Sequence, residues 1–223
     1  MLVTADNQTS HINHSSESEN KDGVYPLSEL LSSQEFIERF NEMVSHARRN
    51  ISESGLAISL ANDGLHISHV QRSPKRIALF DYLSESTDIE KLITSELERL
   101  KDFDAKPAIT IHTHPQRHNG DFIYTGLSTS DIDVWADQSN KYNQSLIEGI
   151  FFIPKKGICS LLLIQRQPNT QINNIYQSWQ EGDSMGSLFD LLERSNIRFT
   201  EIKFDPKNGF NSEQIAKLDW QIT

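Results

Sequence analysis

The sequence predicts an α/β fold of the α+β type, in which helices flank a curved, mixed and mostly antiparallel sheet. Apolar residues recur at helical spacing in some segments and alternate with polar residues in others. These segments follow one another in the order helix, strands, helix, strand, helix, strands, which favours helices packed on a single sheet. Turn residues at Asn62-Asp63-Gly64 and Pro154-Lys155-Lys156-Gly157 join neighbouring strands as hairpins, so most strand pairs should be antiparallel.

The residue pattern in the first half of the chain predicts two amphipathic helices, with a hairpin between them. Ser32 stands three residues before Glu35, a capping-box spacing, and Phe36, Phe40 and Val44 then recur on one helical face. A helix is therefore expected over residues 33–49, and Ser86 or Thr87 should cap a second helix over residues 88–101. The expected strands between them are residues 55–60, 65–70 and 76–82.

The second half should complete the sheet. A strand is expected over residues 107–114, a helix over 128–138, and two strands over 146–153 and 158–165. Residues 173–196 have helical character interrupted near Gly182 and Gly186, and residues 197–204 suit a short strand. We expect residues 1–24 to be a disordered polar tail, 25–168 the globular domain, and 169–223 a helical extension packed on it.

Composition excludes several classes of protein. The chain has 223 residues and a formal net charge of -10, which disfavours sequence-independent binding to nucleic acid and is compatible with a basic protein partner. The one cysteine, Cys159, lies in an apolar run, so we expect a buried thiol and no internal disulfide. No apolar stretch of about 18 residues and no N-terminal signal pattern stand out, so the expected location is the cytoplasm.

The run Ile111-His112-Thr113-His114-Pro115 is the most informative motif. Side chains two apart on a strand point to the same face, so His112 and His114 should project together, and Pro115 should end the strand. Asp131 follows near the start of a helix and can supply a carboxylate. Two histidines and one carboxylate, with water in the fourth position, form a catalytic zinc arrangement. A hydrolytic site also needs a general base, for which Glu53 at the entry to the first strand is the candidate.

These residues resemble the JAMM (MPN-plus, JAB) zinc metallopeptidases. That family combines an upstream Glu entering a strand, His-Ser/Thr-His-Pro and Ser-x-x-Asp, which correspond here to Glu53, residues 112–115 and residues 128–131. The prokaryotic members are the nearest in pattern, because Glu53-Ser54-Gly55-Leu56 approximates their Glu-Thr-Gly-Gly start. The resemblance covers about residues 32–165 and implies a JAB/MPN-like sandwich, similar to cytidine deaminases, over residues 25–168.

The resemblance also implies residue roles and a substrate. His112, His114 and Asp131 would bind one Zn²⁺ per chain, Glu53 would activate water, and Ser128 would hydrogen-bond the developing oxyanion. The implied enzyme is an isopeptidase, similar to a deubiquitinase, that cleaves after the C-terminal glycine of a ubiquitin-like modifier or its conjugate. Alternatives are release of an amino acid or peptide from a ubiquitin-fold sulfur carrier, and a non-catalytic MPN scaffold. A DNA-associated branch carries Asn where this chain has Thr113, and the acidic charge also disfavours it.

The chain departs from the family pattern at one place. Thirteen residues separate His114 from Ser128, where the family usually has seven. The extra length falls in residues 116–127, which could be a surface loop, a flap over the cleft, or a lid that brings His118 to the metal. A second register, with Ser130 and Asp133, is a less favoured alternative to Ser128 and Asp131.

Overall fold

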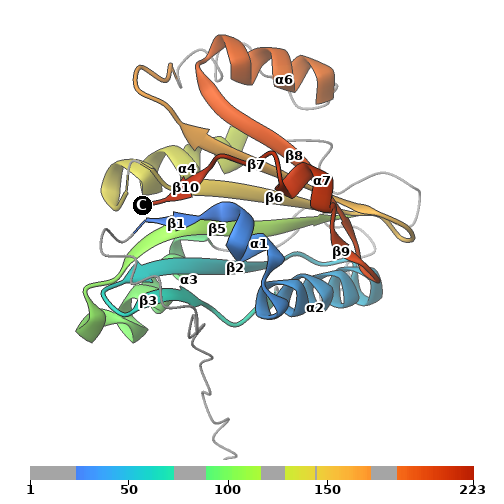
Figure 1. Ribbon diagram of the computed structural model, residues 1–223, viewed down its shortest axis with the longest axis horizontal. Coiled ribbons are helices and arrows are strands. Elements are labelled where there is room, and N and C mark those ends of the chain that lie inside the picture. Colours follow the sequence, from blue (N-terminus) through green and yellow to red (C-terminus); the bar gives the residue numbers. More distant parts are fainter. Residues whose placement is uncertain (1–23, 73–88, 117–128, 144, 172–184) are drawn as a thin grey trace, which may run out of the picture.

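The computed structural model describes residues 24–72, 89–116, 129–143, 145–171 and 185–223 of the chain (Figure 1). Its centre is one curled sheet with strand order β3-β2-β5-β6-β7-β8-β9, and β4 pairs with the start of β2. The strands are β2 (Ser54–Ala61), β3 (Gly64–Ile67), β4 (Gln71–Arg72), β5 (Lys106–Pro115), β6 (Ile147–Ile153), β7 (Cys159–Arg166), β8 (Ile197–Asp205) and β9 (Gly209–Phe210). Only β5 and β6 are parallel, and every other pair in the sheet is antiparallel.

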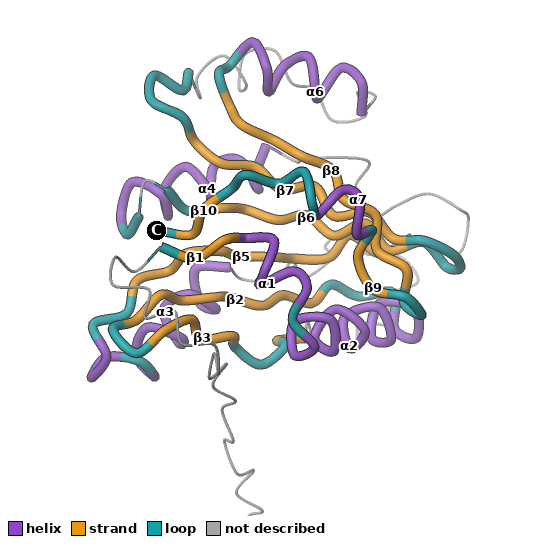
Figure 2. The backbone as a smooth tube through the Cα atoms, in the orientation of Figure 1, coloured by secondary structure: helices purple, strands orange, loops and turns teal. Residues whose placement is uncertain are grey.

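Helices pack against both faces of this sheet (Figure 2). The helices are α1 (Leu27–Ser32), α2 (Gln34–Asn50), α3 (Ile89–Arg99), α4 (Thr129–Lys141), α6 (Met185–Arg194) and α7 (Ser212–Ile215), and a 3-10 turn η1 covers Lys101–Phe103. Among the described residues, no helix is long and apolar enough to cross a membrane.

The alternation of side chains along the central strands creates two cores. Ile111 of β5 and Phe151 of β6 point to the face covered by α1 and α2, where Phe40 packs on Phe151 with ring centroids 4.6 Å apart. Ile150 of β6 points to the opposite face, where it joins Trp135 of α4 and the apolar side of α6. The second core supports the helix that follows the histidine motif.

The two ends of the described chain meet in a separate two-stranded sheet. β1 (Tyr25–Pro26) pairs antiparallel with β10 (Gln221–Ile222), and the amide of Leu27 donates to the carbonyl of Trp220 over 3.0 Å. Trp220 and Ile222 are buried in the core on the α2 face. The C-terminal segment therefore closes one end of this core.

The α+β class and the mostly antiparallel sheet are confirmed. The expected helices and strands between residues 33 and 165 are present wherever the structure describes them, except that the strand expected over residues 65–70 ends at Ile67. The cap of α2 is one residue later than expected, because Ser33, and not Ser32, accepts a hydrogen bond from the Phe36 amide. The expected strand over residues 76–82, the caps at Ser86 and Thr87, and the polar tail up to residue 23 lie outside the described residues.

The description of residues 169–223 as a helical extension was wrong in its secondary structure. This region contains α6 and α7, but it also contains β8, which pairs with β7 along eight residue pairs from Cys159↔Phe204 to Arg166↔Ile197. β8 thus extends the central sheet, and its alternation was visible in the sequence only as a short isolated strand.

Candidate metal centre

The two histidines of the motif meet on the face of β5 that carries α4. Both side chains are buried, and their Nε2 atoms are 3.0 Å apart. The intervening Thr113 points to the other side, where its hydroxyl accepts a hydrogen bond of 2.8 Å from the Ser54 amide. Strand geometry therefore brings two imidazole nitrogens to one point, as the sequence predicted.

Asp131 reaches the same point from the first turn of α4. The next residue, Ile132, and Trp135 are buried against β6, and the Trp135 indole donates to the carbonyl of Leu146 over 3.1 Å. This packing places Asp131 beside the histidines: its Oδ1 lies 3.3 Å from His112 Nε2, and its Oδ2 lies 3.8 Å from His114 Nε2.

The donor set fits a zinc ion. Ligands about 2.0–2.1 Å from zinc at tetrahedral angles stand about 3.3 Å from one another. The three separations here, 3.0, 3.3 and 3.8 Å, bracket that value. Within the described part of the chain, these are the residues that gather three ligand atoms at one place. The alternative ligand Asp133 is exposed on α4, which favours the register with Asp131.

Glu53, the candidate general base, is buried at the entry to β2. Its side chain is only 2% exposed, and it immediately precedes β2. Gly55 of β2 pairs with His112 of β5 in antiparallel register, so continuing that register by two residues sets Glu53 opposite His114. Directly opposed residues project to one face, so this register predicts that Glu53 faces the same side as the candidate metal ligands.

Glu148 of β6 also belongs to the centre, and the sequence analysis missed it. Its Oε1 lies 2.9 Å from Nδ1 of His112, and its Oε2 accepts a hydrogen bond from the Thr110 hydroxyl. The parallel register pairs Thr110 with Glu148 and so places all three side chains on one face. The available signal was a glutamate inside the otherwise apolar strand sequence Ile-Glu-Gly-Ile-Phe-Phe-Ile.

The carboxylates shift the pKa values at this centre. Burial by itself would lower the pKa of His112, but Asp131 and Glu148 together raise it well above 6.5. Burial also raises the pKa of Glu148 above 4.5, although hydrogen bonds from His112 and Thr110 oppose this shift. The raised pKa of His112 means that protons compete with a metal ion for this ring.

Several predicted residues lie outside the described part of the chain. They are Ser128 and the loop residues 117–127, including His118. Cys159 is confirmed as buried, and burial raises the pKa of its thiol to about 11, so it is inert as a nucleophile at neutral pH.

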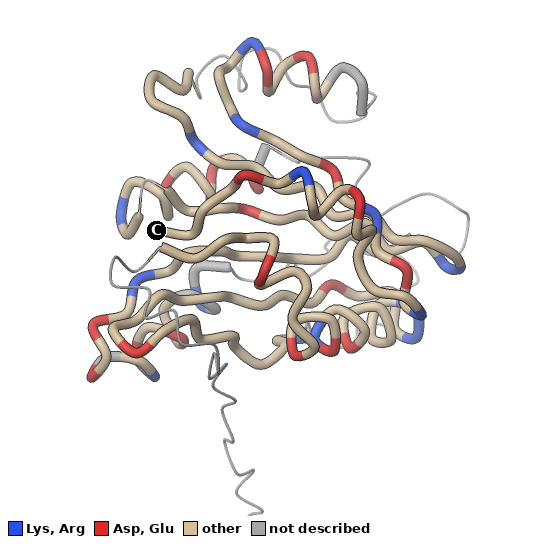
Figure 3. Tube along the Cα trace, in the orientation of Figure 1, with Lys and Arg blue, Asp and Glu red and all other residues tan. Residues whose placement is uncertain are grey.

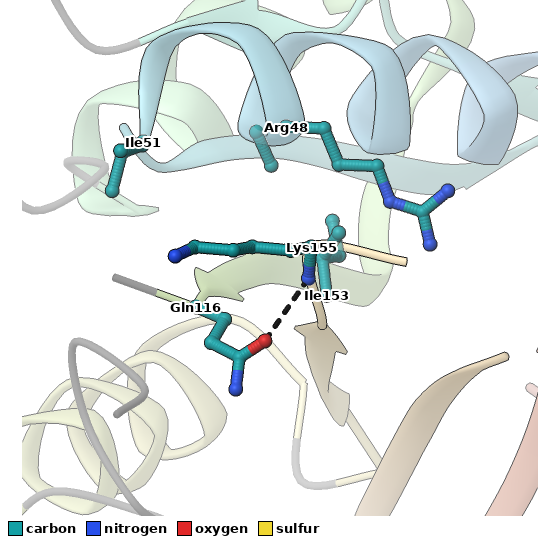
Figure 4. Close-up of a pocket in the computed structure, with 6 residues that line it drawn as sticks. Arg48, Ile51, Gln116, Ile153 and Lys155 are labelled. Atoms are coloured by element: carbon teal, nitrogen blue, oxygen red, sulfur yellow. Dashed lines mark hydrogen bonds between the residues drawn. The ribbon is translucent and has the colours of Figure 1, made fainter. Parts of the chain in front are cut away.

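A cavity of about 220 Å³ lies beside the C-terminal end of α2 (Figure 4). It is lined by Ala47, Arg48, Ile51, Gln116, Ile153 and Lys155. The side-chain oxygen of Gln116 accepts a hydrogen bond of 3.1 Å from the Lys155 amide across one wall. Arg48 turns its guanidinium away from the opening and donates to the carbonyls of Pro154 and Gly157. The cavity borders Gln116, two residues after His114, but contains none of the candidate metal ligands.

Comparison of the chain with known proteins assigns it to no family. No protein-family model matches the chain, and no curated protein matches it either.

Proposed function

We propose that this chain is a zinc-dependent peptidase that cleaves after the C-terminal glycine of a ubiquitin-like modifier or its conjugate. One observation carries the proposal: Nε2 of His112, Nε2 of His114 and the carboxylate of Asp131 converge at one point, and the candidate base Glu53 is buried at the entry to β2, the strand paired with β5. Such a donor set with a neighbouring carboxylate is typical of hydrolytic zinc sites.

The chain's own residues divide the chemistry between them. His112, His114 and Asp131 hold the metal, and zinc, when bound, supplies Lewis-acid chemistry that acidifies water and polarises a carbonyl. Glu53 accepts the proton of the attacking water and returns it to the leaving amine. Its burial keeps competing solvent away from this transfer. Ser128, whose role rests on the sequence motif alone, would donate to the developing oxyanion.

The substrate class rests on the resemblance of the motif. In the JAMM family a complete ligand set accompanies cleavage at the C-terminal glycine of ubiquitin-like modifiers. An extended peptide tail of this kind can bind by adding to a sheet edge, where main-chain hydrogen bonds give affinity.

The first test is the zinc content of the purified chain, measured by plasma mass spectrometry. We expect about one zinc per chain in the wild type and in Asp133→Ala, but none in Asp131→Ala. Asp133 is the matched control because it lies on the same helix and is exposed. Absence of zinc from the wild type after reconstitution would overturn the proposal and favour a non-catalytic scaffold.

The second test concerns Glu53. Glu53→Gln should retain zinc and the fold but lose about 10²–10⁴-fold in the rate of modifier cleavage, because the amide cannot accept the proton. Product masses separate the two substrates: an isopeptide yields two proteins, whereas a sulfur-carrier adduct yields a protein and an amino acid or peptide. Full activity of the zinc-loaded Glu53→Gln variant would show that another group is the base.

A further inference from the structure

Glu148 is an unusual residue for its position. It lies in the middle of the sheet, where the central strands carry almost no charged residues (Figure 3), and its side chain is 1% exposed. Among the described residues, its carboxylate contacts only the Thr110 hydroxyl and the His112 ring. A buried carboxylate costs several kcal/mol unless it is paired and hydrogen-bonded, so its place here requires compensation.

An ionised Glu148 assigns the roles of the hydrogen-bonding atoms in these two contacts. The Thr110 hydroxyl donates to Oε2 of Glu148, which leaves Oε1 to accept from Nδ1–H of His112. With the proton on Nδ1, the neutral ring presents the lone pair of Nε2. That atom is the one lying 3.0 Å from His114 Nε2 and 3.3 Å from Asp131 Oδ1.

We infer that Glu148 is a positioning residue, which holds His112 in the tautomer and ring orientation that direct Nε2 at the metal. The inference rests on the proposed zinc centre and adds a residue to it. A carboxylate behind a metal-bound histidine fixes the ring and raises its basicity, and its loss typically costs 10–100-fold in metal affinity. The negative charge of Glu148 also offsets part of the charge of a dication one imidazole away.

The sheet, and not a loop, supplies this contact. Thr110 and Glu148 are paired in the parallel register of β5 and β6, and His112 follows two residues later on the same face. Rigid strands thus hold the carboxylate, the ring and the hydroxyl in a fixed relation, as positioning of a metal ligand requires.

The test compares zinc affinity, by competition with a chromophoric chelator, in the wild type and in Glu148→Gln. The amide keeps the volume and one acceptor but removes the charge, and we expect zinc to bind 10–100-fold more weakly at unchanged stoichiometry. The visible spectrum of the cobalt-substituted protein should also change, since the field at His112 changes. Glu96→Gln is the matched control: Glu96 is equally buried but is paired with Arg99 on α3.

The outcomes separate this inference from the proposed function. Wild-type zinc affinity and an unchanged cobalt spectrum in Glu148→Gln, with zinc lost in Asp131→Ala, would overturn the role of Glu148 and leave the metal centre standing. A wild type that binds no zinc would overturn both. If Glu148→Gln does not fold, Thr110→Val replaces it: removal of the hydroxyl that anchors Oε2 should weaken zinc binding, and an unchanged affinity would contradict the inference.

Discussion

The candidate centre concentrates acidic groups around two histidines. Glu53 and Glu148 are almost fully buried, and Asp131 is 15% exposed beside His112. In the metal-free chain this arrangement retains protons, as the raised pKa of His112 indicates. Protons and a metal ion therefore compete for the same atoms, and the balance depends on pH.

The raised pKa of His112 predicts how the stability of the metal-free chain depends on pH. Because the pKa of His112 is raised above 6.5, the folded state binds more protons than the unfolded state once the pH exceeds that value. The free energy of unfolding should then fall as the pH rises toward the folded pKa, with a slope of at most about 1.4 kcal/mol per pH unit for this one group. The raised pKa of Glu148 acts in the same direction.

Urea unfolding of chelator-treated protein between pH 6 and 9 measures this effect. His112→Asn should flatten the curve, because the titrating ring is gone. A wild-type stability that increases with pH over this interval would contradict the assignment of the proton to the folded centre.

At the scale of the secondary-structure elements, β6 has no free space for a side chain at Gly149. A Cβ atom at this position would lie 2.8 Å from Cγ1 of Ile111 and 3.1 Å from Cδ2 of Leu163, on the two neighbouring strands. Contacts this short require the side chains of Ile111 and Leu163 to shift. Gly149 therefore leaves room for these two side chains in the core on the α2 side of the sheet.

Gly149→Ala should destabilise the fold by about 1–3 kcal/mol, the usual range for overpacking a core. The shift in the urea midpoint at constant m-value gives the change. Ile158→Ala is a suitable control, because Ile158 is 59% exposed and its truncation should change stability by less than about 0.5 kcal/mol. If Gly149→Ala is as stable as the wild type, the contact with Ile111 is not a constraint.

The sequence predicted those parts of the centre that depend on local spacing. Period-two alternation placed His112 and His114 on one face of β5, and the helix start placed Asp131 near them. Glu148 escaped prediction because its contact with His112 joins residues 36 positions apart through a parallel strand pair. Strand register across such a distance follows from the packing of the sheet and helices together, which a local pattern does not encode.

The same distinction applies to the C-terminal part of the chain. Alternation suggested a strand over residues 197–204, but a strand gives no sign of its partner until the sheet is assembled. β8 pairs with β7, and β10 pairs with β1 near the other end of the described chain. The sheet is therefore completed by residues that the family resemblance does not reach.

Zinc binding should stabilise the folded chain as a unit, because the proposed ligands come from β5 and α4 and exist together only in the folded state. A ligand that binds only the folded state contributes RT ln(1 + [L]/Kd), about 2.7 kcal/mol at a free concentration of 100 times Kd. Scanning calorimetry should show a melting temperature that rises with zinc and falls after chelation. Asp131→Ala should give no such response, whereas Asp133→Ala should behave as the wild type. An equal rise in Asp131→Ala would mean that zinc stabilises the chain from another place, and the centre formed by His112, His114 and Asp131 would lose its support.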